Sequence, residues 1–107
     1  TSADEPRALA PFRCAGLRIE PERLVAARDG EEIELTAREV ALLALFASEP
    51  GRIVSRRRLL RDVWGMRAAD SVETRTVDVH IAKLRKKLGP HGELIATVRG
   101  QGYRLCL

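Results

Sequence analysis

The sequence has few aromatic residues and few cysteines. Its 107 residues include two Phe, one Trp and one Tyr, so that aromatic side chains make up 4% of the chain. This scarcity argues against a surface on which successive nucleic-acid bases stack on aromatic rings, and it predicts an aliphatic core. The two cysteines, Cys14 and Cys106, have neither metal nor redox spacing. A reducing cytoplasm fits this usage best.

Other absences exclude whole classes of protein. The chain shows no signal peptide and no long apolar run, which argues against a membrane segment. Its serines have no convincing histidine partner, no glycine-rich phosphate loop opens a helix, and no residues have metal-ligand spacing. We therefore expect no enzyme, no catalytic residues, no metal and no cofactor.

Positive charge is concentrated in the second half of the chain. Residues 1–51 carry six Arg against ten Asp and Glu, a net charge of −4, whereas residues 52–107 carry thirteen Lys and Arg against five Asp and Glu, a net charge of +8. A basic half indicates a polyanionic partner, although a solvated charged surface is the plain alternative. Hydrophobic residues make up 45% of the chain, enough for one domain with its own core.

The N-terminal part predicts a small antiparallel sheet. Residues 1–13 have no periodicity and are typical of a linker or disordered tail, so we place the domain at residues 14–107. Three short β-like runs follow within residues 15–35, and the turn "RDGE" separates the last two.

Three helices follow the predicted strands. Thr36 and Glu39 form a capping box before the first helix, which "EPG" ends. The second begins at Ser55 and contains Arg58 at its third position, where a cation opposes the helix dipole. A nearby anion would explain that choice, although we favour a simple exposed arginine. The third and longest helix covers about residues 71–88.

The third helix has two distinct faces at 3.6 residues per turn. One is an apolar stripe for the core, and the other carries cations and small or methyl-bearing side chains. Cations can reach phosphates or base edges, and methyl groups of Val or Thr can touch the thymine methyl in the major groove. A surface helix with one stray valine is the alternative. The stripe is Val77, Ile81, Leu84 and Leu88, the opposite face is Arg75, Val79, Ala82, Lys83 and Lys86, and Thr76 and His80 lie on one shoulder.

Two residues of this helix have more than one interpretation. His80 has no partner at ligand spacing, so it is either a neutral hydrogen-bond donor to a phosphate or a partly packed ring. Asp78 could accept from a cytosine amino group or orient Arg75, but we favour a local salt bridge.

The chain ends in a predicted β-hairpin with a cationic tip. The stretch "TVRGQGYRL", residues 97–105, lies between strand-like runs and places Arg99 beside Gly100 and Gly102. The order of elements therefore predicts an α+β fold, a winged helix-turn-helix with an N-terminal antiparallel sheet, three helices and a C-terminal β-hairpin wing.

Four stretches together resemble the DNA-binding effector domain of OmpR/PhoB-type response regulators. They are "LTAREVALLALF", "GRIVSRRRLLRDVWG", "RTVDVHIAKLRKKLG" and "TVRGQGYRL", and the resemblance covers about residues 15–107. It implies that the third helix enters the major groove and the wing the minor groove. Thr76, Val79 and Lys83 would face bases; Trp64, Arg75, His80, Arg85 and Tyr103 would hold phosphates, with Thr97 a weaker candidate; and Arg99 would enter the minor groove.

The resemblance also implies partners. These are double-stranded DNA with promoter direct repeats, a second copy of the full-length protein on that DNA, and a histidine kinase acting on a receiver domain outside these residues. RNA polymerase would contact the loop of Gly65, Met66, Arg67, Ala68, Ala69 and Asp70. The cytoplasm is the expected location, with no membrane partner.

Two departures leave the base preference open: Ala82 stands where a basic residue can occur, and Lys83 stands where relatives carry Arg. Rival hypotheses are a winged helix that binds protein, and the same domain fused to a sensor other than a receiver.

Overall fold

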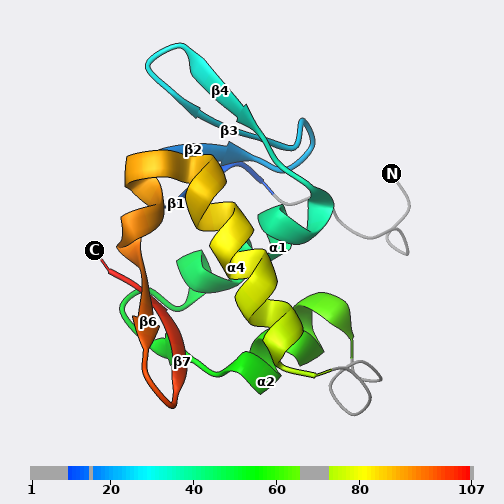
Figure 1. Cartoon of the computed structure of the whole chain (residues 1–107). Coiled ribbons are helices and arrows are strands. Elements are labelled where there is room, and N and C mark those ends of the chain that lie inside the picture. The colour runs from blue at the N-terminus through cyan, green and yellow to red at the C-terminus, as the bar shows by residue number, and fades with distance from the viewer. Residues whose placement is uncertain (1–9, 15, 66–72, 107) are drawn as a thin grey trace.

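The chain folds into two antiparallel sheets with helices between them. The computed structural model describes residues 10–14, 16–65 and 73–106. Figure 1 shows a four-stranded sheet at one end of the molecule and the C-terminal hairpin at the other, which confirms the predicted α+β fold. The first sheet has the order β1-β2-β3-β4, formed by Phe12–Cys14, Leu17–Glu20, Val25–Arg28 and Glu31–Glu34.

The first strand begins earlier than the predicted domain boundary at residue 14. β1 starts at Phe12, which pairs with Ile19, and Cys14 pairs with Leu17. Phe12 packs against the core, and Phe12 and Arg13, which were assigned to the tail, both belong to the sheet. A three-residue strand is too short for its alternation to be recognised beside an irregular segment. The rest of the predicted tail, residues 1–9, lies outside the described residues.

The first two helices begin where the sequence predicts. α1 (Ala37–Ser48) has the predicted capping box, in which Glu39 N donates to Thr36 Oγ1 at 3.1 Å and Thr36 N donates to Glu39 Oε1 at 2.8 Å. Ser55 caps α2 (Arg56–Leu59) by accepting from Arg58 N. The helix continues into a π-helical turn, η1 (Leu60–Trp64), which Gly65 ends.

The long helix, α4 (Arg75–Leu88), begins later than predicted. Residues 71 and 72 lie outside the described residues, and Thr74 provides no side-chain cap. Thr76 N and Val77 N instead donate to the carbonyls of Glu73 and Thr74, three residues earlier. These hydrogen bonds make a tighter turn at the start of the helix. The predicted core stripe of α4 is confirmed, since Val77, Ile81, Leu84 and Leu88 are buried.

The C-terminal hairpin is part of a three-stranded sheet. β6 (Ile95–Val98) follows the 3₁₀ turn η2 (Gly89–Leu94) and pairs with β7 (Gly102–Leu105), as predicted. A strand that the sequence analysis missed, β5 (Ile53–Val54), pairs with the other edge of β7. A Cβ atom on Gly102 would lie 2.1 Å from Val54 O. This glycine therefore permits the close approach of β5.

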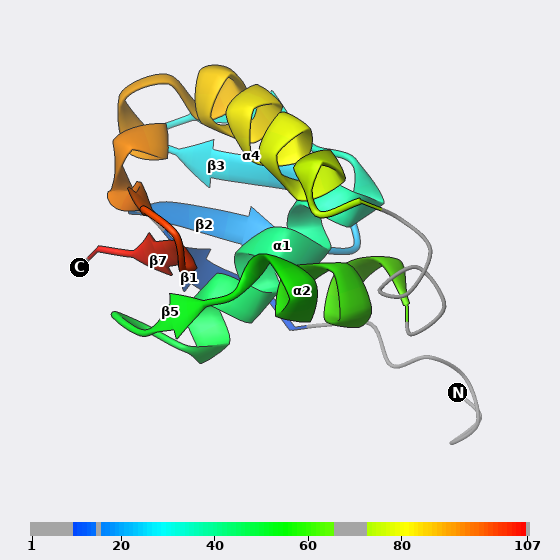
Figure 2. The same ribbon diagram turned by 60° about the horizontal axis from the view of Figure 1, so that its bottom comes forward.

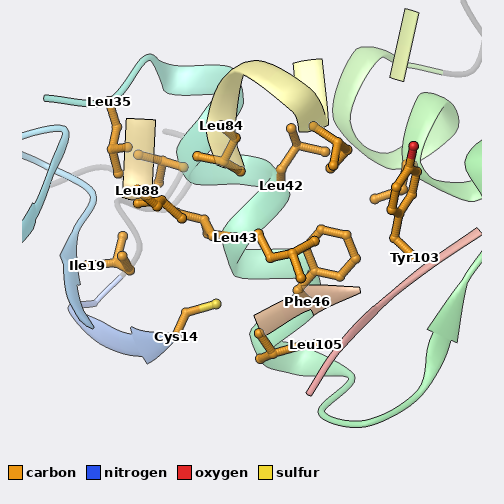
Figure 3. Packing of buried hydrophobic residues seen from close by; sticks show 14 of the residues in the cluster. Cys14, Ile19, Leu35, Leu42, Leu43, Phe46, Leu84, Leu88, Tyr103 and Leu105 are labelled. Atoms are coloured by element: carbon orange, nitrogen blue, oxygen red, sulfur yellow. The ribbon is translucent and has the colours of Figure 1, made fainter. Parts of the chain in front are cut away.

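One aliphatic core holds the two sheets and the helices together. Figure 3 shows Leu42, Leu43 and Phe46 of α1 between Leu84 and Leu88 of α4 and residues of both sheets. Figure 2 shows α1 and α4 alongside the four-stranded sheet. The core leaves the far side of α4 free, and within the described ranges no helix is long and apolar enough to cross a bilayer.

Candidate nucleic-acid interface

The outer face of α4 carries exposed cations around small or apolar side chains. Arg75, Lys83 and Lys86 are exposed, and Val79 is 46% exposed, which confirms the predicted division of the helix. Within the described part of the chain, the two lysines form no ion pair. A helix face with uncompensated cations and little bulk at its centre can approach a polyanion closely.

Trp64 and His80 lie together at one side of this face. Their ring centres are 4.9 Å apart with an edge-to-face angle of 84°, and the guanidinium of Arg38 from α1 lies 4.9 Å from the Trp64 ring centre. His80 Nδ1 lies 2.9 Å from Thr76 O, and because a carbonyl only accepts, Nδ1 must carry the hydrogen. These contacts agree with the partly packed ring.

Arg85, Thr97 and Tyr103, three predicted phosphate contacts, cluster where α4 meets the hairpin. Arg85 donates from Nε to Ile95 O and from Nη2 to Thr97 Oγ1, both at 2.8 Å. Tyr103 is 4% exposed and its hydroxyl donates to Asp78. Burial and then this hydrogen bond raise the pKa of the Tyr103 phenol. These groups therefore hold each other in place in the DNA-free protein.

Asp78 forms a salt bridge, as favoured, but the partner is not local. Its Oδ1 lies 2.7 Å from Nε of Arg56, the first residue of α2. Partial burial raises the pKa of Asp78, but the hydrogen bonds from Tyr103 and Arg56 and the positive charge of Arg56 outweigh it, so the net shift is downward. The sequence analysis missed Arg56 because nothing in the run "SRRR" distinguishes the arginine that faces α4.

Arg99 lies at the exposed tip of the hairpin. The tip is a tight turn in which Gln101 N donates to Val98 O at 2.9 Å, and Gly100 has a φ of 76°, which favours glycine. In the part of the chain that the structure describes, Arg99 has no hydrogen bond or ion pair. The guanidinium is thus available to an external anion.

The described site residues predicted from the sequence lie on two parts of the fold. α4, with Trp64 beside it, supplies one part, and the hairpin supplies the other. Gly65 ends η1 next to Trp64, but Met66, Arg67, Ala68, Ala69 and Asp70, the remainder of the predicted polymerase loop, lie outside the described residues. Among the residues that the structure describes, no group of three His, Cys, Asp or Glu side chains could hold a metal ion.

Known proteins are similar to this chain in sequence and in arrangement. Residues 30–105 match the family model described as "Transcriptional regulatory protein, C terminal". The phosphate regulon transcriptional regulatory protein PhoB of Escherichia coli (strain K12) is 44% identical over 91 residues, which cover 83% of this chain and 39% of PhoB. The chain thus spans about two fifths of the length of the curated relatives it matches.

Solved structures agree in fold. The DNA-binding domain of E. coli CadC superimposes with a TM-score of 0.78 at 31% identity, covering 89% of this chain and 90% of that one. The DNA-binding domain of Klebsiella pneumoniae RstA, solved in complex with the RstA box, gives a TM-score of 0.74 at 31% identity, covering 92% of this chain and 98% of that one. The chain belongs to the family of C-terminal domains of transcriptional regulatory proteins, the winged-helix DNA-binding effector domains of OmpR/PhoB type.

Proposed function

We propose that the chain binds double-stranded DNA sequence-specifically, as the output domain of a bacterial transcriptional response regulator. The observation that carries this proposal is the outer face of α4, where Lys83 and Lys86 flank small or apolar side chains without an internal counter-charge. The likeness to RstA, whose domain was solved on its own DNA box, supports the same conclusion.

The two parts of the surface would read different grooves. α4 would lie in the major groove with Thr76, Val79 and Lys83 towards base edges, since a Val or Thr methyl fits the thymine methyl and a lysine can reach guanine acceptors. The wing would place Arg99 in the neighbouring minor groove, where a guanidinium is attracted to narrow A·T-rich segments. The phosphate backbone would be lined by Trp64, Arg75, His80, Arg85 and Thr97. Tyr103, which is buried and donates its hydroxyl hydrogen to Asp78, would instead hold the wing in place beside it.

The remaining partners depend on the longer protein. A single domain reads few base pairs, so we expect two copies of the full-length protein on direct repeats, where pairing raises the effective concentration without new base contacts. A receiver domain under a cognate histidine kinase would promote pairing, and residues 65–70 would contact RNA polymerase. The cytoplasm is the matching location. Footprints confined to one half-site at every concentration of full-length protein would contradict the pairing.

Binding-site selection from random duplexes tests the central proposal. The 107-residue chain should enrich a short motif, and footprinting on that motif should show protection in one major groove and the adjacent minor groove. Enrichment of no sequence over repeated rounds, with equal weak binding to all duplexes, would contradict sequence-specific recognition.

A further inference from the structure

The hairpin is attached to α4 at two points along the helix. Asp78 contacts β7 through the Tyr103 hydroxyl, and Arg85 contacts β6 through Thr97 Oγ1 and Ile95 O. Asp78 and Arg85 are seven residues apart, which places them two turns, or about 10 Å, apart on the same side of the helix. Two contacts at this separation constrain the angle between the helix and the hairpin, whereas one contact would act as a pivot.

Both points of attachment meet the same pair of hairpin residues. Thr97 and Tyr103 are directly opposite each other across β6 and β7. The next pair, Val98 and Gly102, is the last before the turn that carries Arg99. The helix therefore holds the hairpin one pair away from its tip, so a change at this pair moves the Arg99 guanidinium directly.

The Asp78 end of this attachment includes a third element. A single oxygen, Asp78 Oδ1, accepts from Arg56 Nε at 2.7 Å and from the Tyr103 hydroxyl. The guanidinium carbons of Arg56 and Arg85 each lie 5.3 Å from the centre of the Tyr103 ring. The carboxylate thus draws α2, α4 and β7 together, even though a negative charge on a DNA-facing helix opposes the attraction of phosphates.

We propose that Asp78 is a positioning residue which, through Arg56 and Tyr103, fixes the distance between the wing tip and the outer face of α4. This inference rests on the proposed function. Its consequence is that the domain recognises a major-groove half-site and an A·T-rich minor-groove segment at one fixed spacing. Without the carboxylate the hairpin keeps its pairing with β5 and its bonds to Arg85 but loses the contact between Tyr103 and α4, so Arg99 can reach segments at several spacings.

The experiment measures affinity on duplexes in which the A·T-rich segment is moved by one or two base pairs relative to the selected half-site. Wild type should lose about tenfold in affinity when the segment is moved, the size of one lost specific contact. Asp78→Ala should bind all spacings within about threefold of one another. Asp62→Ala is the matched control, because it removes an equal charge whose partners, Arg58 and Arg61, bond no hairpin residue in the described part of the chain. It should keep the wild-type spacing dependence.

Tyr103→Phe provides a second variant, since it removes only the hydroxyl and retains the buried ring. It should flatten the spacing dependence as Asp78→Ala does, whatever its effect on overall affinity. Thermal melting checks that each variant is folded. If wild type binds no duplex, the proposed function is wrong; if wild type discriminates spacings and both folded variants do so equally, only the positioning role is wrong. If Asp78→Ala instead lost its preference at a single base pair and kept the spacing dependence, Asp78 would be a base-reading residue. That result would overturn the proposal.

Discussion

Arg58 shows how a residue that opposes a local rule finds its explanation at a distance. A cation near the start of a helix is unfavourable to the helix dipole, and the sequence alone favoured a simple exposed side chain. In the structure Arg58 Nη2 lies 2.7 Å from Glu49 at the end of α1, and its Nε lies 3.2 Å from Asp62. The hydrogen bond and charge of Arg58 lower the pKa of Glu49. The simple interpretation was wrong, because Arg58 joins two helices through anions.

At the same scale, the core stripe and the outer face of α4 should separate under mutation. Leu84 is fully buried, so Leu84→Ala should lower the free energy of unfolding by about 2–5 kcal/mol through the lost contacts and the cavity. Lys83 is exposed and without an ion pair in the described part of the chain. Lys83→Ala should leave the melting temperature nearly unchanged and relax base preference at one position. Thermal melting and binding-site selection check both, and unfolding by Lys83→Ala would show that the two faces are misassigned.

Asp78 predicts an acid dependence of stability. Because its pKa is lower in the folded protein than in the unfolded chain, the unfolded chain binds the proton more tightly and acid favours unfolding. The stabilisation by ionised Asp78 is complete at pH values above its pKa in the unfolded chain, about 4. It is lost as the pH falls through the lower pKa of Asp78 in the folded protein. Denaturant unfolding at several pH values should show the stability difference between wild type and Asp78→Asn shrinking as the pH falls below about 4. A difference that stays constant over this range would contradict the assignment.

At the scale of elements, the wing predicts a groove-dependent contribution from Arg99. The minor groove distinguishes A·T from T·A poorly, so Arg99 reads width more than base identity. Arg99→Ala should weaken binding by roughly 1–3 kcal/mol on sites with A·T-rich flanks, and less on G·C-rich flanks, where the groove is wider. Titrations of wild type and variant on both flanks measure this difference. Equal losses on the two flanks, or a loss explained by a lower melting temperature, would reject the minor-groove role.

The elements that the sequence predicted well are those whose signals are local. The capping box of Thr36 and Glu39, the apolar stripe of α4 and the glycine-containing hairpin each lie within one segment and follow from spacing alone. The two-residue strand β5 has no periodicity of its own and forms because β7 offers a free edge and Gly102 lets it approach. The contact of Arg56 with Asp78 joins residues 22 positions apart, and three neighbouring arginines offered no local means of choosing among them.

At the scale of the whole molecule, the division of charge along the sequence becomes a division in space. The acidic half contains the four-stranded sheet, where Glu31, Glu32 and Glu34 of β4 are exposed. The basic half contains α4 and the wing, and Figure 1 shows the wing and this sheet at opposite ends. Such a charge distribution orients the approach to a polyanion and raises the association rate. The modest net charge of +4 therefore averages over an acidic half and a basic half of the chain.

The exposed cations of α4 and the wing predict that DNA affinity falls steeply with salt. Each phosphate neutralised by a cation releases condensed counterions, so a domain with several phosphate contacts should lose about 10³-fold in affinity between low and physiological salt. Titrations on the selected site at increasing salt, plotted as the logarithm of affinity against the logarithm of salt concentration, give the slope. A flat slope would contradict the DNA-binding function itself.

Single substitutions can locate the origin of that slope. Lys86 is an exposed cation of α4, and if it contacts a phosphate, Lys86→Ala should reduce the slope by about one and weaken binding to all sequences alike. Arg23 is the matched control, because it is an exposed cation of the acidic half whose charge is already compensated by Glu20 and Glu32. Arg23→Ala should leave the slope unchanged, although both variants lower the net charge by one. Equal effects of the two variants would mean that affinity follows total charge, and would contradict an interface located on α4.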